Sequence, residues 1–140
     1  MDILYTAHAT AQGGGRNGKS ATDDGSISLA MAVPKEMGGA GGGANPEQLF
    51  AVGYAACYMG ALRAAAAKEK KNIPDDATIR AHVGIGKRDD GEGFGLEITL
   101  EGHIPGMSRE EVEALVAKAH VICPYSHSIR GNVGLTTRAV

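Results

Sequence analysis

The stretch NPEQLFAVGYAACYMGALRAAAAKE at residues 45–69 decides the fold. Its opening predicts a helix start, because asparagine can cap a helix, proline suits the first helical position, and glutamine follows where a capping box places it. We predict a helix from Pro46 to about Glu69. From Leu49 to Leu62 nearly every residue is apolar, alanine or glycine. We therefore expect this helix to be buried on most sides.

The flanking segments predict a second helix and five strands. Ser108 and Glu111 form a capping box that begins a helix, and Pro124 ends it. Because strands precede, separate and follow two helices without regular alternation, the order predicts the α+β class, with sheet and helices in separate layers. Four strands are expected from alternating apolar residues and one closes the chain: 2–10, 27–33, 79–85, 96–100 and 133–139.

The composition bounds the function classes. A chain of 140 residues is close to the usual size of one domain, so we expect a single domain over residues 1–140. The formal net charge is -2 and no polybasic run occurs, which argues against nucleic acid as a partner. No apolar stretch reaches the ~18 to 20 residues of a membrane span, so no membrane insertion is expected. The first twelve residues lack the features of a signal peptide, so the expected location is the cytoplasm.

The two cysteines, Cys57 and Cys123, are the candidate reactive groups. Free cysteine is often a small core residue, and this reading competes with a chemical one. Three features favour chemistry: Arg16 in a glycine-rich loop, Glu47 at the helix N-terminus, and the position of Cys123 directly before Pro124, where the helix stops. In a reducing compartment such a pair does not form a permanent disulfide.

Arg16 and Glu47 matter because a thiol with a pKa of ~8.5 is only a few per cent thiolate at neutral pH. Lowering that pKa by two units takes about 2.7 kcal/mol. A guanidinium bonded to the Cys57 sulfur can supply this stabilisation, and a carboxylate can hold the guanidinium in place. The same guanidinium would stabilise a departing alkoxide. The Cys57 sulfenate would then condense with Cys123.

The spacing along the long helix predicts a composite site. Glu47 and Cys57 are ten residues apart, which is about 15 Å along one unbroken helix. Glu47 therefore cannot serve the cysteine of its own helix, whereas two such helices crossing in a two-fold dimer bring the two groups together. Small residues permit that approach, and a chain with only 4% aromatic residues builds a thin core, which favours burial against a second subunit. The small residues are Gly53, Ala55, Ala56 and Gly60.

Two segments carry a resemblance to a known family. The sequence from Asn45 to Cys57 and the sequence Val121-Ile122-Cys123-Pro124-Tyr125-Ser126 resemble the organic hydroperoxide resistance (Ohr) branch of the Ohr/OsmC family. The likeness extends over nearly the whole chain, including the early Gly-Gly-Arg loop, residues 33–39 and residues 130–133. Both cysteines, the arginine and the glutamate occur in the expected order.

The resemblance implies an OsmC-like fold, with antiparallel sheets packed around two long central helices in an intertwined homodimer. It implies a peroxidatic role for Cys57, a resolving role for Cys123, and an Arg16–Glu47 salt bridge that activates Cys57. It further implies alkyl and fatty-acid hydroperoxides as substrates and dihydrolipoamide or a lipoylated protein as electron donor. No bound metal or prosthetic group is expected.

Several alternatives stay open at this point. The pair could belong to a redox sensor or a small-ligand-binding protein, or to a peroxidase of the OsmC branch with another substrate preference. His120, Cys123 and His127 could be imagined as metal ligands, but no established metal motif supports them. Gly13-x-Gly15-x-x-Gly18 matches a dinucleotide fingerprint by letters only, since no βαβ unit surrounds it.

Overall fold

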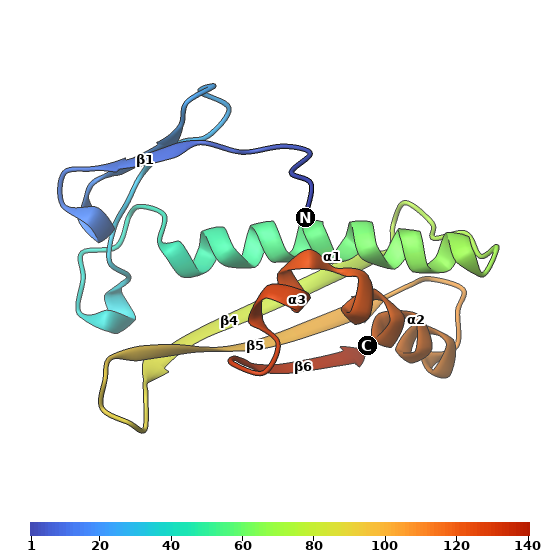
Figure 1. The fold of residues 1–140 in the computed structure, drawn as a ribbon. Coiled ribbons are helices and arrows are strands. Elements are labelled where there is room, and N and C mark those ends of the chain that lie inside the picture. Colours follow the sequence, from blue (N-terminus) through green and yellow to red (C-terminus); the bar gives the residue numbers. More distant parts are fainter. The chain divides into compact units, whose positions relative to one another are not determined.

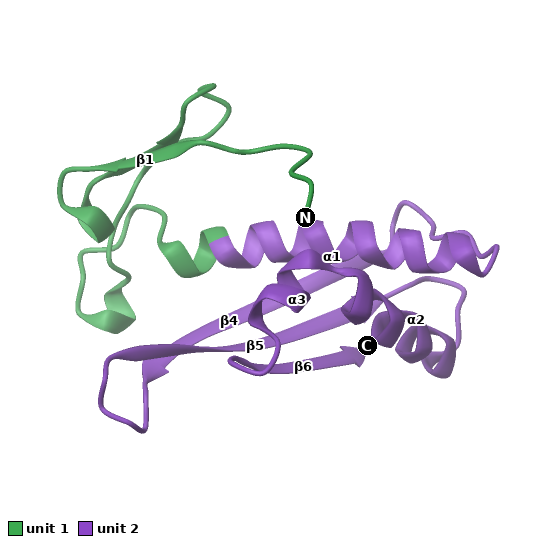
Figure 2. Cartoon of the chain, in the orientation of Figure 1, with its two compact units in different colours: residues 1–49 green, residues 50–140 purple.

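The computed structural model describes residues 1–140 and divides them into two compact units (Figure 2). Unit 1 is Met1–Leu49 and unit 2 is Phe50–Val140. The boundary follows the first turn of the long helix α1, Pro46–Lys68.

Unit 1 is built on a three-stranded antiparallel sheet with the order β1-β2-β3. A short 3-10 helix, Gly15–Asn17, lies in the β1–β2 connection, and a second one, Lys35–Met37, follows the sheet. The strands, of which β1 is labelled in Figure 1, are β1 (Ala9–Gln12), β2 (Lys19–Thr22) and β3 (Ser28–Ala30).

The N-terminal strand is shorter than the alternation at residues 2–10 predicts. It begins only at Ala9, which pairs with Thr22, the last residue of β2. Residues 1–7 extend past that end and have no neighbouring strand in unit 1, so the ladder that defines a strand cannot form. Strand β2 was missed, because its residues Lys-Ser-Ala-Thr carry no apolar alternation. The predicted strand 27–33 is confirmed over Ser28–Ala30 only.

Unit 2 combines a three-stranded sheet with helices on one of its faces (Figure 1). The predicted strands at 79–85, 96–100 and 133–139 and both predicted helices are confirmed, and the first two strands are longer than expected. Pro124 ends the second helix as predicted but also begins a third one, which was not predicted. The elements after α1 are β4 (Thr78–Lys87), β5 (Phe94–His103), α2 (Arg109–Ile122), α3 (Pro124–Ile129) and β6 (Gly134–Ala139).

The sheet of unit 2 is mixed, with β5 in the centre. Strands β4 and β5 form an antiparallel hairpin, whereas β6 lies parallel to β5. A parallel connection needs a crossover of a dozen or more residues, and α2 with α3 supplies it. The expected α+β class is therefore confirmed, with the correction that one of its sheets is not purely antiparallel.

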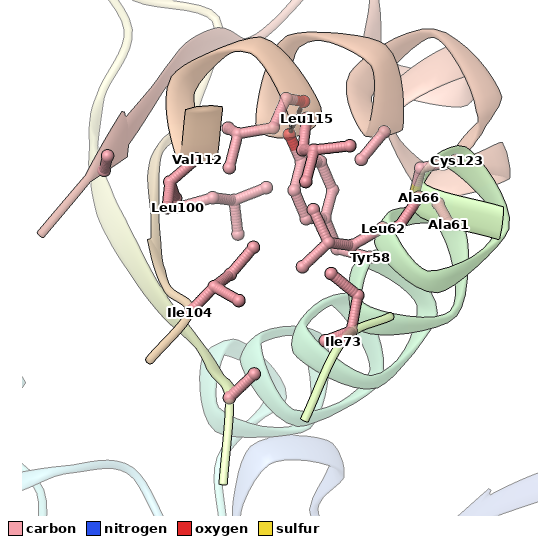
Figure 3. Close-up of a cluster of buried hydrophobic side chains, with 14 of the residues drawn as sticks. Tyr58, Ala61, Leu62, Ala66, Ile73, Leu100, Ile104, Val112, Leu115 and Cys123 are labelled. Carbon is pink, nitrogen blue, oxygen red and sulfur yellow. Dashed lines mark hydrogen bonds between the residues drawn. The ribbon is translucent and has the colours of Figure 1, made fainter. Parts of the chain in front are cut away.

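The hydrophobic core of unit 2 lies between the sheet and its helices. Figure 3 shows Tyr58 and Leu62 of α1 facing Val112 and Leu115 of α2, with Leu100 of β5 beside them. Alternate residues of β4 and β5 face this cluster, and the residues between them are exposed or half-buried. The helices thus cover one face of the sheet.

Helix α1 has the predicted start but not the predicted burial. Its cap is reciprocal: the Asn45 backbone N–H donates to the Gln48 side chain, and the Gln48 N–H donates to the Asn45 side chain, at 3.0 and 2.9 Å. The expectation of burial on most sides is wrong for the single chain, because only one stripe is buried. That stripe comprises Tyr54, Tyr58, Ala61, Leu62, Ala65 and Ala66. The opposite stripe is exposed although it is apolar.

By length and composition α1 could also cross a membrane, with a mean hydropathy of 1.3 over its eighteen-residue window. The expectation that no apolar stretch reaches this length is therefore wrong, because the many alanines raise the mean. A helix in the core of a globular unit satisfies the same criterion, and about a third of the window is packed inside the protein. The absence of membrane insertion stays a prediction.

Gly102 in β5 allows α2 to approach the sheet closely. A Cβ atom at this position would lie 2.9 Å from Cγ2 of Val116, a buried β-branched residue that has little freedom to move. We expect Gly102→Ala to lower the free energy of unfolding by about 1–3 kcal/mol, the usual cost of overpacking. Urea denaturation measures this change, and an unchanged midpoint would show that α2 shifts freely. Gly86→Ala, where nothing lies within 4 Å, is the control.

Candidate active site

Arg16 and Glu47 form a two-pronged ion pair within unit 1. Arg16 lies in the 3-10 helix after β1, and Glu47 lies in the first turn of α1. The Arg16 Nη1 and Nη2 groups donate to the two Glu47 carboxylate oxygens at 2.9 and 2.6 Å. The Glu47 side chain is only 12% exposed, whereas that of Arg16 is 38% exposed. The guanidinium is therefore held by the carboxylate while part of it stays accessible.

Glycines shape the loop that carries Arg16. Gly13 and Gly15 adopt φ values of 76° and 57°, in the left-handed region that favours glycine. A Cβ atom on Gly18 would lie 2.1 Å from the Gln12 carbonyl oxygen, so no larger residue fits without moving the backbone. The three glycines that match the dinucleotide fingerprint therefore form a tight loop that carries Arg16.

The Arg16–Glu47 contact keeps both groups charged. The hydrogen bond from Arg16 lowers the pKa of Glu47, against the opposing effect of burial, and the same bond raises the pKa of Arg16. Because the pKa of Glu47 is lowered on folding, its contribution to stability is present above the ordinary carboxyl pKa. It is lost as the pH falls through the lowered value. The pair is thus fully ionised at neutral pH.

The two cysteines meet within unit 2. Cys57 lies on α1 and is half-buried, and Cys123 lies fully buried at the junction of α2 and α3. Both are free thiols, and the Cys123 S–H donates to the Cys57 sulfur at 3.6 Å. The structure therefore brings the two predicted cysteines together from positions 66 residues apart.

The surroundings of Cys57 in unit 2 do not favour its thiolate. Burial raises the pKa of the Cys57 thiol, and the contact with Cys123 raises it further. The backbone N–H of Tyr125 in α3 opposes these effects through a hydrogen bond to the sulfur, but the net direction is upward. A charge outside this set is needed if the thiolate is to form at neutral pH.

An aromatic cluster lies beside the cysteine pair. Phe50 and Tyr54 of α1 contact Tyr125 of α3, with ring centroids 5.9 and 5.6 Å apart. The Tyr125 ring lies against Gly53, where a Cβ atom would come 3.1 Å from the phenol oxygen. Sequence reasoning assigned no role to Phe50, Tyr54 or Tyr125, and it expected Gly53 to let two helices approach each other, whereas here Gly53 makes room for the Tyr125 ring. The signal was local: Gly53 and Tyr54 precede Cys57 by about one helical turn.

The imagined metal ligands do not assemble. No group of three or more histidine, cysteine, aspartate or glutamate side chains is arranged to hold a metal ion. The Nδ1 atom of His120 is buried without a hydrogen-bond partner. His82 and His103 lie on the exposed sheet face and form hydrogen bonds with Glu101 and the Val140 carbonyl at 3.0 and 2.9 Å, respectively.

Comparison with known proteins places the chain in a family. Residues 39–138 match the OsmC-like proteins. The organic hydroperoxide resistance protein of Xanthomonas axonopodis pv. citri is 49% identical over 135 residues, which cover 96% of this chain and 93% of that protein. The corresponding values for OhrB of Bacillus subtilis are 42% over 130 residues, with 93% of each chain covered.

A crystal structure gives the same result. The organic hydroperoxide resistance protein OsmC of Legionella pneumophila superposes with a TM-score of 0.91 and 46% identity, over 99% of this chain and 98% of that one. The chain therefore belongs to the OsmC family. The resemblance to the organic hydroperoxide resistance branch and the predicted OsmC-like α+β fold are both confirmed.

Proposed function

We propose that this protein is a cysteine-based peroxidase that reduces organic hydroperoxides to alcohols. The observation that carries the proposal is the pair of free thiols, Cys57 and Cys123, with 3.6 Å between their sulfur atoms. One of them is partly accessible and the other is fully buried, which suits an attacking and a resolving thiol. The names of the curated relatives support the choice of substrate class.

In the proposed cycle, the two thiols supply the two electrons that reduce the peroxide. The Cys57 thiolate attacks one peroxide oxygen, so that an S–O bond forms, the O–O bond breaks and the alkoxide leaves as alcohol after taking a proton. Cys123 then attacks the Cys57 sulfur, which forms the disulfide and releases the oxygen as water. A dithiol returns two electrons and two protons and restores both thiols.

Activation of Cys57 is assigned to Arg16. Since burial raises the pKa of the thiol, the residues of unit 2 alone leave it protonated. The Arg16 guanidinium is fully charged and oriented by Glu47, yet partly accessible. Placed against the sulfur, it would stabilise first the thiolate and then the departing alkoxide.

The active form is proposed to be a homodimer with composite sites. Ten residues of α1 separate Glu47 from Cys57, so the Arg16–Glu47 pair of a second copy is the better partner for the cysteine. The exposed stripe of α1 supports this assembly, since an apolar helix face is a common contact between subunits. It consists of Leu49, Val52, Ala56, Gly60, Ala64 and Ala67.

The dimer proposal predicts the effect of one substitution in this stripe. Val52 is 71% exposed in the single chain. We expect Val52→Glu to convert a dimer of twice the 14.4 kDa chain mass into monomers, because two buried carboxylates would face each other without partners. Sedimentation equilibrium measures the mass. Arg109→Glu on the exposed side of α2 is the control, and a wild-type monomer would contradict the proposal.

The electron donor is proposed to be dihydrolipoamide or a lipoylated protein, acting in the cytoplasm without a bound metal or prosthetic group. A dithiol suits the cycle because its second thiol releases the mixed disulfide that the first one forms with the protein.

Steady-state turnover tests the proposed function. We expect the reduced protein to consume excess cumene hydroperoxide with dihydrolipoamide, and to do so much faster than with glutathione or thioredoxin. A redox sensor or ligand-binding protein would be oxidised once and then stop. Faster consumption of hydrogen peroxide than of cumene hydroperoxide would instead favour the substrate preference of another OsmC branch.

A further inference from the structure

A buried hydrogen bond lies next to the cysteine pair. The Tyr54 hydroxyl and the Ser126 hydroxyl share a hydrogen bond of 2.7 Å, and both side chains are completely buried. Tyr54 precedes Cys57 by three residues on α1, and Ser126 follows Cys123 by three residues in α3. The two contacts are therefore antiparallel rungs between the same two segments, about one helical turn apart.

The hydrogen bond between Tyr54 and Ser126, called the polar rung below, is unusual because both hydroxyls are buried. Ser126 is the one buried polar side chain of unit 2 that is not aromatic. Burying a serine hydroxyl costs free energy, compared with burying alanine, unless the hydroxyl forms a hydrogen bond with a well-placed partner. Burial raises the pKa of Tyr54, so the phenol stays protonated and available for the bond. Removing either hydroxyl would leave the other one without a partner.

The rung acts on the segment that carries Cys123. This cysteine ends α2 and begins α3, and its carbonyl accepts the first hydrogen bond of α3 from His127 at 2.9 Å. Any sliding of α3 along α1 would therefore change the distance between the two sulfur atoms. The Tyr125 backbone N–H, which opposes the rise in the pKa of Cys57, would move with it.

We propose that Tyr54 and Ser126 are positioning residues that hold α3 in register on α1, so that Cys123 stays within reach of Cys57. Their hydrogen bond raises the effective concentration of one cysteine at the other. The consequence for turnover rests on the proposed peroxidase function: faster disulfide closure shortens the lifetime of the Cys57 sulfenate and limits its oxidation to sulfinic acid.

Equilibration with reduced and oxidised glutathione measures the effective concentration directly and needs no peroxide. We expect Tyr54→Phe and Ser126→Ala each to lower it about tenfold, the effect of losing one buried hydrogen bond. The double variant should show no further loss, because each single variant already breaks the same rung. Ser126→Ala removes a single oxygen atom and keeps the test valid if Tyr54→Phe does not fold.

Tyr58→Phe is the matched control. It removes a hydrogen bond from an equally buried phenol one turn further along α1, where Tyr58 donates to the Val116 carbonyl at 2.6 Å. We expect it to lower the urea midpoint but to change the effective concentration less than twofold. If Tyr54→Phe and Tyr58→Phe lowered the effective concentration equally, the Tyr54–Ser126 hydrogen bond would contribute only to general stability, and the proposal would be overturned. An unchanged effective concentration in Tyr54→Phe and Ser126→Ala would also overturn it.

Turnover separates this inference from the proposed function. In the peroxidase assay, Tyr54→Phe and Ser126→Ala should accumulate Cys57 sulfinic acid in fewer turnovers than wild type, as counted by intact-protein mass. Wild-type protein that fails to reduce any peroxide would refute the proposed function. The glutathione measurement would still decide whether the rung positions the cysteines.

Discussion

Replacing Cys57 by serine is expected to abolish the reduction of organic hydroperoxides. The peroxide is attacked by a thiolate, and a serine hydroxyl is a far weaker nucleophile that stays protonated at neutral pH. Cys123→Ser should behave differently. Its Cys57 thiol remains, so one peroxide per chain is reduced before the sulfenate stalls or forms a mixed disulfide with the added thiol.

Two measurements separate these outcomes. Peroxide consumption with dihydrolipoamide should stay at the background rate for Cys57→Ser, and without added thiol it should stop after one equivalent for Cys123→Ser. Intact-protein mass without added thiol should show one bound oxygen on Cys123→Ser and none on Cys57→Ser. Urea denaturation of both variants controls for misfolding, which matters because Cys123 is completely buried. Full turnover by Cys57→Ser would end the assignment.

Replacing Arg16 by methionine is expected to slow the reaction of Cys57 about 100-fold at neutral pH. A guanidinium that lowers the thiol pKa by about two units supplies roughly 2.7 kcal/mol of stabilisation to the thiolate. Without it the pKa rises, so the midpoint of the pH–rate profile should move upward by about two units. The rate should then recover in part at high pH, with a residual defect because the departing alkoxide has also lost its partner.

The pH profile distinguishes activation from a structural effect. Single-turnover reaction with cumene hydroperoxide, followed from pH 5 to about 10, gives the midpoint for each variant. Glu47→Gln should show a smaller upward shift, since it keeps Arg16 but loosens its orientation. Arg109→Met removes an exposed ion pair, Arg109–Glu113, and is the control. A slower reaction with an unshifted midpoint would contradict the role of Arg16 in forming the thiolate.

Local chemistry made most helix boundaries predictable. The start of α1 depends on Asn45 and Gln48, three residues apart, and the start of α2 on Ser108 and Glu111. Such caps use hydrogen bonds between close neighbours, so the pattern of residue types is sufficient to place them. The β4–β5 hairpin was predictable for the same reason, because its strands alternate and its turn is short.

Pairing between distant segments was not predictable in this way. Residues 2–8 alternate as a strand would, yet they lie outside β1, since unit 1 provides them no neighbouring strand. Strand β2 forms without apolar alternation, because β1 and β3 flank it on both sides. The parallel direction of β6 depends on the crossover through α2 and α3, which no short pattern encodes.

By itself the sequence determined the α+β class, the long apolar helix and the candidates Arg16, Glu47, Cys57 and Cys123. Only the tertiary structure decided that Arg16 donates two hydrogen bonds to Glu47. It also decided that Cys57 contacts Cys123, next to the hydrogen bond between Tyr54 and Ser126. The reason is the range of the interactions. Capping and periodicity act within a few residues, whereas these contacts join residues 31 to 72 positions apart and exist only when the helices have packed.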